Sequence, residues 1–481
     1  MIKFFFILFS AAAAITCSAM AVESTPGGLA TLVGENTNET SLTVTGSIDA
    51  SDLEFIASEM TKLESLDIYG ASIVAYEGAA LRNGNFTSPA NVLQSYALFG
   101  SSVKSIAFPA SLAEIGEFAL ASANLETVNI PAGAAVGNSA FKDCTSLRTV
   151  VFAGATSVSN EAFAGCTALE IVAGSANLVN IGNSAFKGCI SLAAFTFGKN
   201  LEKIGEYSFA ATALAAADLS ACTKLTELSA GAFAECGSLA TLKLPENLTT
   251  VGNSAVFAAK ALTSLNFPSS LQVIDDYGFY GLSELAYEYT KEYSETPGVN
   301  TSLVSVGRYG LAGCSNIGQF VLPSTVKYLG DYAMANWTSL GDLFVRELSE
   351  APTLGENVWS GVNQPEVWLY VTASNKAVFE AENQWKEFKL TESTTGSDNV
   401  VSDDLKEAKI AAWFDADVIN VLADNEILNV EVYDATGLQL VAESINADNA
   451  RISTSQWQTK LYIVRVTMAD GTVTGVKLVR R

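Results

Sequence analysis

The stretch Ile181-Gly182-Asn183-Ser184-Ala185-Phe186 decides the fold, because versions of it recur along most of the chain. Eleven copies are found at residues 115–120, 136–141, 158–163, 181–186, 204–209, 228–233, 251–256, 274–279, 306–311, 329–334 and 354–359. The step between copies is close to 23 residues, with one longer step between the copies that end at Phe279 and Leu311. A fixed period of this length is typical of repeat proteins.

Each copy is followed by a small-residue corner and then by an alternating apolar stretch, as in Leu239 to Leu244, which Pro245 closes. The period of two predicts a short strand with one buried face, and proline ends the strand because it cannot donate to a ladder. We expect the glycine of the phrase to permit a tight corner and the Ala-Phe pair to drive an aromatic ring into the centre of the coil. One such coil cannot bury its own apolar edge, so the coils must stack. The sequence therefore predicts a mainly β solenoid of about 11 coils of about 23 residues.

These copies resemble the BspA-like leucine-rich repeat of bacterial surface and secreted proteins, which implies a right-handed stack over residues 96–360. Solenoid ends must be capped. Leu42 to Ile73 resembles the N-terminal cap of the family, so we assign residues 22–95 to that cap and a first irregular repeat. Val367 to Val371 and Ala377 to Phe388 resemble its closing strand and helix, which places a C-terminal cap at residues 361–390.

Beyond a polar linker at residues 391–405 the repeat ends, and residues 406–481 are predicted to form a small Ig-like β-sandwich. Three stretches of this region resemble the C-terminal sorting domain of type IX secretion cargo, namely Val430 to Gly437, Leu461 to Val466 and Lys477 to Arg481. This resemblance implies a Bacteroidetes-type source, passage across the outer membrane by the type IX machinery, and attachment to the cell surface. The alternative is an ordinary Ig-like binding module.

Residues 1–21 have the pattern of a Sec signal peptide, with Lys3, an apolar run from Phe4 to Thr16, and a small-x-small site that predicts cleavage after Ala21. Cys17 leaves open a lipoprotein anchor. No later segment has the length of a transmembrane helix. We therefore expect the protein to be extracellular or on the outer-membrane surface.

Composition excludes several classes of function. The 481 residues include 51 Asp plus Glu against 27 Lys plus Arg, and no histidine. Catalytic systems that need histidine and His-ligated metals are therefore excluded, and a net charge of −24 argues against nucleic acid as a partner. The acidic residues fall at variable repeat positions, which indicates a solvated surface. We predict no enzyme activity, no metal and no cofactor.

Six cysteines follow the signal peptide, and five of them lie three residues after the central aromatic position of a repeat. This placement favours a ladder of small buried free thiols, with disulfides between neighbouring coils as the alternative. The six are Cys144, Cys166, Cys189, Cys222, Cys236 and Cys314.

The outward positions of the predicted strands form a mildly polar, nearly uncharged row on a strongly acidic protein. Such a face suits either an extended protein or glycan ligand, or simply a soluble β-surface. The row continues through Gln319 and Asp342. The candidate binding residues are Thr127, Asn129, Thr149, Thr196, Thr241, Lys243, Ser264 and Asn266.

Aromatic residues form further candidates. The long step between copies holds an insertion in which Tyr287, Tyr289 and Tyr293 are candidate contact residues. A second set, Tyr277, Tyr309 and Tyr332, shares one repeat position and should stack in a row. The tryptophans between residues 337 and 385 either seal the last coils or form a platform for sugars.

Taken with the family resemblance, these features predict an exported cell-surface protein that binds an extracellular or host protein without catalysis, through its repeat sheet. Glycan binding through the aromatic residues and a structural role in the cell envelope are the alternatives.

Overall fold

The computed structural model describes residues 19–78, 86–286, 301–345, 348–392, 410–415, 418–434, 438–454, 457, 461–469 and 473–479. The chain divides into two compact units, of which the first ends at Glu392 and the second contains the C-terminal strands. The predicted tyrosines 287, 289 and 293 lie outside the described residues.

The N-terminal part of the first unit combines parallel strands with two short helices. Its elements are β1 (Ala19–Ser24), α1 (Leu29–Val33), β2 (Ser41–Ile48), α2 (Ala50–Glu59), β3 (Ser65–Asp67), β4 (Ala71–Ile73) and the hairpin strands β5 (Tyr76–Gly78) and β6 (Phe86–Ser88). The carboxylate of Asp52 ties the two helices together, because it accepts hydrogen bonds from the backbone N–H groups of Gly27 (3.0 Å), Leu29 (2.9 Å) and Asp49 (3.0 Å).

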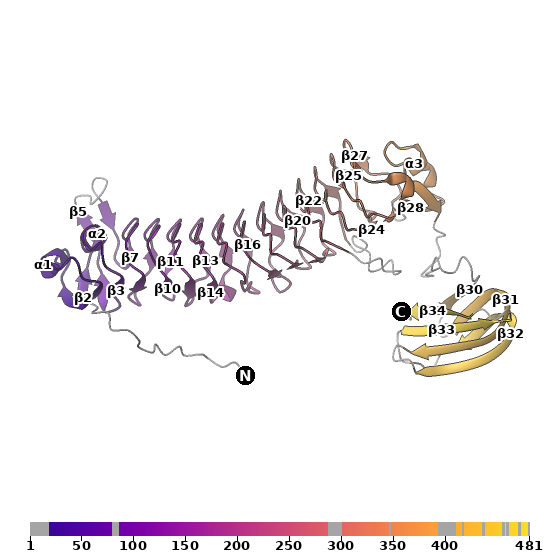
Figure 1. Cartoon of the computed structure of the whole chain (residues 1–481), viewed down its shortest axis with the longest axis horizontal. Helices are drawn as coiled ribbons and strands as arrows, with labels where there is room; N and C mark the ends of the chain where they lie inside the picture. Colours follow the sequence, from indigo (N-terminus) through magenta and orange to yellow (C-terminus); the bar gives the residue numbers. More distant parts are fainter. Residues whose placement is uncertain are drawn as a thin grey trace. The chain divides into compact units, whose positions relative to one another are not determined.

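The repeats form a β-solenoid with a row of short strands on each of two sides, which confirms the predicted architecture (Figure 1). One row holds β8 (Ser105–Ala107), β10 (Thr127–Ile130), β12 (Thr149–Phe152), β14 (Ile171–Ala173), β17 (Ala216–Asp218), β19 (Thr241–Lys243), β21 (Ser264–Leu265), β24 (Gln319–Val321), β26 (Asp342–Phe344), β28 (Trp368–Val371) and β29 (Lys389–Glu392). The other holds β7 (Val92–Leu93), β9 (Glu114–Ile115), β11 (Ala135–Val136), β13 (Ser157–Val158), β15 (Asn180–Ile181), β16 (Lys203–Ile204), β18 (Glu227–Leu228), β20 (Thr250–Val251), β22 (Val273–Ile274), β23 (Ser305–Val306), β25 (Tyr328–Leu329) and β27 (Thr353–Leu354).

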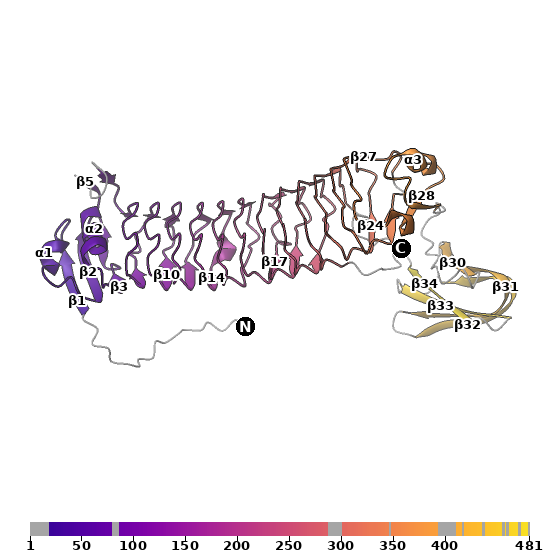
Figure 2. The same ribbon diagram turned by 45° about the horizontal axis from the view of Figure 1, so that its top comes forward.

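Strands of successive coils lie side by side along the solenoid (Figure 2). They pair in parallel and in register, as in β10 and β12, where Thr127 lies opposite Thr149 and Val128 opposite Val150. The register carries every inward side chain onto its counterpart, so the core is continuous from coil to coil. Phe163, Phe186 and Phe209 are fully buried, and their ring centroids stack 5.4 Å apart. The expectation that the Ala-Phe pair fills the centre of the coil is confirmed.

The glycine of the repeat phrase has a different role from the one expected. Gly182 and Gly205 do not have positive φ. Instead, a Cβ atom on either would lie 2.5 Å from backbone of the preceding coil. The corner is formed two residues later, by residues such as Ser184 (φ 54°) and Tyr207 (φ 53°) in the left-handed region. Glycine is therefore needed because neighbouring coils approach closely, and the corner is made by other residues.

The ladder of the first row is interrupted between β14 and β17. Phe195 occupies the inward position there, which is Val150 in β12 and Ala217 in β17, and it packs against Phe186 (5.2 Å) and Phe209 (4.9 Å). Its ring is only partly buried. The interruption coincides with a partly buried phenylalanine at a position that is fully buried in β12 and β17.

The last coils are sealed by aromatic side chains together with a 3₁₀ turn (Gln364–Glu366) and α3 (Lys376–Ala381). Trp337, Trp359 and Trp385 are at most 2% exposed. The rings of Trp359 and Trp385 meet edge to face at 5.3 Å. Buried rings cannot stack on sugars, so these three tryptophans form no sugar platform. Trp368 on β28 is only partly buried, and Lys389 Nζ lies 3.7 Å from the centre of its ring.

The second unit is an antiparallel β-structure. It contains β30 (Ile410–Asp415), β31 (Val418–Asp434), β32 (Gln439–Ser453), β33 (Leu461–Met468) and β34 (Val473–Val479). The long strand β31 pairs with β30 through its first part and with β33 through its last part. Alternating residues such as Val430, Val432, Val464 and Val466 form a separate apolar core.

Candidate functional site

The first strand row continues the sheet that begins with β1, β2 and β3. The outward positions of its strands from β2 to β21 form the surface that we call the strand face. Four of the predicted binding residues are exposed on the strand face: Thr127, Asn129, Lys243 and Ser264. Two others, Thr149 and Thr241, are partly exposed. Thr196 is also exposed, but it lies in the interrupted stretch that forms no strand.

A ladder of hydroxyl groups extends across the N-terminal half of the strand face. The strand register places Ser41, Ser65, Ser105, Thr127 and Thr149 opposite one another in succession. The hydroxyl groups of Ser105 and Ser65 are 3.4 Å apart. Sequence reasoning missed the three serines because the N-terminal strands lack the regular repeat phrase. The alternating pattern around Ser65 could have identified them.

Charged residues flank this ladder rather than being absent from it. A charged residue directly precedes each ladder residue from Ser65 to Thr149, and also Ile171, which holds the equivalent position on β14. The sign of the charge alternates along this series: Glu64, Lys104, Glu126, Arg148 and Glu170. Lys104 Nζ lies 2.8 Å from Glu64 Oε1, and Arg148 Nη1 lies 2.8 Å from Glu170 Oε1. The hydrogen bond that Lys104 donates to the Glu64 carboxylate raises the pKa of Lys104. The charges at this margin thus largely neutralise one another.

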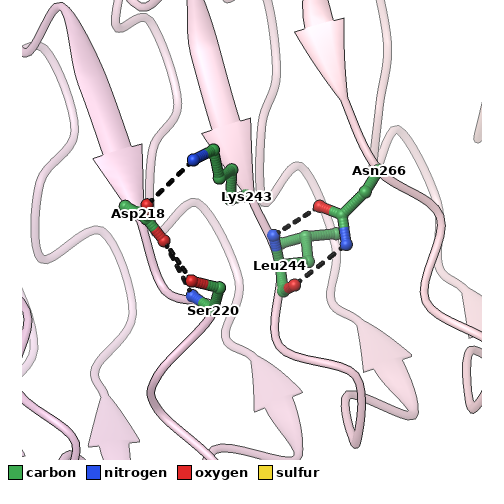
Figure 3. A network of polar contacts seen from close by, with 5 residues as sticks. All are labelled: Asp218, Ser220, Lys243, Leu244 and Asn266. Carbon is green, nitrogen blue, oxygen red and sulfur yellow. Dashed lines mark hydrogen bonds and ion pairs between the residues drawn. The ribbon is translucent and has the colours of Figure 1, made fainter.

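The C-terminal half of the strand face carries one ion pair (Figure 3). Asp218 on β17 accepts hydrogen bonds from the backbone N–H (3.1 Å) and hydroxyl (2.5 Å) of Ser220, and Lys243 Nζ on β19 lies 3.1 Å from its other oxygen. Hydrogen bonds from Ser220, followed by that from Lys243, lower the pKa of Asp218. Lys243 therefore does not offer a free positive charge to a ligand.

Asn266 is held by the neighbouring coil. Its Oδ1 accepts from the backbone N–H of Leu244 at 2.7 Å, and its Nδ2 donates to the Leu244 carbonyl at 2.9 Å (Figure 3). The side-chain amide thus pairs with backbone in place of a further strand residue, because β21 ends at Leu265. This candidate binding residue has a structural role in joining two coils.

Replacing Asn266 by alanine is expected to lower the free energy of unfolding by about 1–3 kcal/mol, because the backbone groups of Leu244 lose both partners. Urea denaturation followed by circular dichroism would measure the change. Ser264→Ala is the matched control: Ser264 is exposed two residues earlier, and its loss should cost less than about 0.5 kcal/mol. Equal effects of the two substitutions would contradict the structural role.

The strand face ends before β24, where the predicted continuation of the row is wrong. Gln319 and Asp342 are only 2% and 8% exposed. In β24 all three residues are buried, so the alternation of inward and outward positions no longer holds. On β26, Phe344 stacks on Tyr370 of β28 at 4.6 Å, which adds an aromatic layer beside Asp342. Both sides of these strands are covered.

The predicted tyrosine row is confirmed. The ring of Tyr309 stacks on Tyr277 at 5.2 Å and on Tyr332 at 4.9 Å, with interplanar angles of 15° and 5°. Asn357 Nδ2 donates to the Tyr332 hydroxyl at 3.0 Å. Because the rings cover one another's faces, the row presents mainly its edges. Sugar rings pack on aromatic faces, so the row is a poor platform for them.

The described cysteines are all free and buried, which confirms the thiol ladder and not the disulfide alternative. Each ladder thiol donates to a carbonyl of the preceding coil, as in Cys166 to Phe141 (3.1 Å) and Cys189 to Phe163 (3.2 Å). Trp337 Nε1 occupies the same position and donates to Leu311 at 2.7 Å. Cysteine suits this position because it is small, apolar and able to donate, but Ala259 and Leu282 are also fully buried there and have no side-chain donor.

Burial raises the pKa of Cys189 and of Cys314 to about 12, from an ordinary value of 9.0. The unfolded thiols ionise first, so their contribution to stability is complete below pH 9 and is lost as the pH rises towards 12. By pH 10 the loss should be about 1 kcal/mol for each thiol. Urea denaturation midpoints at pH 8 and pH 10 would test this expectation. The midpoint of a variant with both Cys189→Ser and Cys314→Ser should fall less between the two pH values than that of the parent chain. An equal fall in the two proteins would contradict the expectation.

The described residues contain no group of three or more Cys, Asp or Glu side chains placed to hold a metal ion. None of the helices in this part of the chain has the length and apolar character needed to cross a bilayer.

Family and structural comparisons agree with this architecture. A model of the BspA type leucine rich repeat region matches residues 72–173, 156–286 and 287–400. A secretion system C-terminal sorting domain matches residues 415–480, which indicates type IX secretion to the cell surface or the extracellular space.

Among solved structures, a leucine-rich repeat protein from Bacteroides ovatus is similar with a TM-score of 0.51 and 20% identity, over 73% of this chain and 84% of that chain. The pneumococcal vaccine antigen PcpA aligns with a TM-score of 0.34 and 16% identity, over 74% and 80% of the two chains. At these identities the first similarity shows the fold alone. No match was found among curated proteins. The repeat-family matches extend over more than half of the residues, and the chain belongs to the BspA-type leucine-rich repeat family.

Proposed function

We propose that this protein is an exported surface protein that binds a protein partner, without catalysis, through the strand face between β2 and β21. The observation that carries the proposal is the contrast between this face and the rest of the molecule. A chain with a net charge of −24 presents here exposed hydroxyl groups, small side chains and three ion pairs.

Such a face suits a wide, mainly neutral contact. Each hydrogen bond to a ligand contributes about 1 kcal/mol net, so affinity must come from many contacts over a large area. Adjacent parallel strands lie about 4.8 Å apart, which gives the hydroxyl ladder from Ser41 to Thr149 a regular spacing against which an extended partner can align. The regular spacing supports recognition of an extended segment of an extracellular or host protein.

The proposed lack of catalysis rests on composition and on the family. Without histidine, the chain lacks the commonest general base. Leucine-rich repeat families of this kind are typically non-catalytic. In this proposal the C-terminal sorting domain has a different partner, the type IX secretion machinery, and is removed by processing within residues 391–405.

A binding panel with the full exported chain would test the function, using immobilised extracellular matrix proteins and a glycan array in parallel. Thr127→Lys combined with Thr149→Lys places two large charges on the strand face and should abolish saturable protein binding. Thr145→Lys is the matched control, because Thr145 is exposed in the same coil as Thr149 but lies outside the strand. Asn266 is left unchanged, since its substitution also weakens the fold.

The panel separates the alternatives. Loss of binding in both the double variant and the control would contradict recognition through the strand face. Binding to glycans alone, insensitive to the double variant, would favour a glycan-binding protein. Absence of binding to either class would favour a structural role in the cell envelope.

A further inference from the structure

Backbone hydrogen bonds join the corners of successive coils, where a corner is the segment that follows each short strand of the second row. Three N–H groups at alternate residues of one corner donate to three carbonyl groups of the next corner. Between the last two corners the donors are Tyr332, Met334 and Asn336. Their acceptors, at 2.9, 3.2 and 2.7 Å, are the carbonyl groups of Glu356, Val358 and Ser360. Each corner therefore presents a row of donors that matches the main chain of the following coil.

The last corner, after β27, has no coil beyond it. The three N–H groups at the same positions belong to Asn357, Trp359 and Gly361, and none of them has a hydrogen-bond partner among the residues that the structure describes. In the same part of the chain, the indole Nε1 of Trp359 is buried without a partner. Polar groups at buried positions normally have partners, so this row of donors indicates a place where a ligand can supply acceptors.

A cavity of about 460 Å³, which we call the terminal recess, lies at this end of the corner stack. Its lining joins the last corner to the C-terminal cap and consists of Glu356, Asn357, Trp359, Ser360, Gln364 and Gln384. Gln384 follows α3, and β27 and α3 lie at the same end of the solenoid (Figures 1 and 2). Its Oε1 accepts from the N–H of Val358 at 2.8 Å, so the cap satisfies the donor between Asn357 and Trp359 and not those two.

We propose that the terminal recess binds a short extended segment of a partner protein, whose main-chain carbonyls accept from Asn357, Trp359 and Gly361. The alternate spacing of these donors fits a polypeptide, because in every earlier coil the same row pairs with a main chain. A complete further coil has no room, since β28 and β29 continue the first strand row past β26. This site lies on the corner side of the solenoid and adds to the function proposed for the strand face.

The side chains of the recess favour a basic segment. Glu356 is exposed and makes no ion pair with any described residue. Asn357 and Gln364 use their amide nitrogen atoms to donate to the Tyr332 hydroxyl and the Gln384 carbonyl, so their oxygen atoms can accept from a ligand. A lysine or arginine of the segment would form a charge-assisted hydrogen bond with Glu356.

A peptide taken from the protein itself provides the probe. Arg-Tyr-Gly-Ala-Ala, acetylated and amidated at its ends, copies residues 308–312, whose carbonyls accept from the preceding corner. It carries Leu311→Ala because the aromatic side chains of the cap already fill the centre of the last coil. Isothermal titration calorimetry with the full chain should show saturable binding of one peptide per chain. Absence of binding at millimolar peptide would overturn the proposal.

Two substitutions test whether the peptide occupies the recess. Ser360→Tyr fills the recess, and the fold should accept it because Tyr280 holds the same repeat position. Glu356→Lys reverses the charge. Each should weaken binding about tenfold or more. Glu117→Lys is the matched control: Glu117 is exposed at the same repeat position, but the next coil covers its corner, so the affinity should not change.

The other outcomes contradict the proposal. Unchanged affinity in both recess variants, or equal losses in these variants and in Glu117→Lys, would exclude the recess as the site. Loss of peptide binding in the Thr127→Lys, Thr149→Lys protein would assign the peptide to the strand face, so the two proposals can fail separately. Displacement of the peptide by free N-acetylglucosamine would identify a sugar site instead. Circular dichroism would establish that each variant is folded.

Discussion

Replacing Gly198 by alanine is expected to lower the free energy of unfolding by about 3 kcal/mol or more. A Cβ atom on Gly198 would lie 1.8 Å from the carbonyl oxygen of Ala176 and 2.6 Å from its carbonyl carbon. Ala176 belongs to a 3₁₀ turn (Ser175–Asn177), in which Ser175 is buried and donates to the Thr196 carbonyl at 2.9 Å. Because the obstruction is backbone, relief requires the two coils to separate.

Gly237→Ala is the matched control for this prediction. Gly237, like Gly198, does not have positive φ, and a Cβ atom on it would meet no other atom within 4 Å. Alanine there should be neutral or slightly stabilising, because it reduces the conformational freedom of the unfolded chain. Urea denaturation of both variants by circular dichroism would measure the difference. A loss of similar size in the two proteins would mean that close approach to Ala176 does not control stability at Gly198.

Phe186→Ala is expected to cost about 3–5 kcal/mol, the range for removing a buried phenylalanine. The ring is fully buried, stacks between Phe163 and Phe209 at 5.4 Å each, and meets Phe195 edge to face at 5.2 Å. These neighbours come from three different coils, so the cavity weakens two interfaces together. Because each coil contacts only its neighbours, amide hydrogen exchange should increase most in the coils around residue 186.

Two controls accompany this variant. Phe186→Leu should cost less, since Leu120 and Leu311 occupy the equivalent position in other coils and are fully buried there. Ile190→Ala changes a side chain that is 61% exposed in the same coil and should be nearly neutral. If Phe186→Leu were as destabilising as Phe186→Ala, the stack of rings itself would matter more than the filled volume. If all three variants were alike, the central role of the ring would be wrong.

The sequence predicted local features well and contacts between coils less well. The inward position of Phe186 and the free state of Cys189 follow from their place in the repeat, and both are confirmed. The burial of Gln319 was not predicted, because its repeat position is the same as that of exposed Thr127. Likewise, nothing near Asn266 in the sequence indicates that its amide pairs with Leu244, 22 residues earlier.

The sequence by itself determined the period of the solenoid and which side chains face inward, since both depend on residue spacing within one coil. Only the tertiary structure decided why Gly182 must be glycine, where the ladder of the first row is interrupted, and where the strand face ends. It also decided that Ala19 and Met20 belong to the folded sheet. These outcomes depend on the distance and packing between neighbouring coils, and a single copy of the repeat does not encode what the next coil places against it.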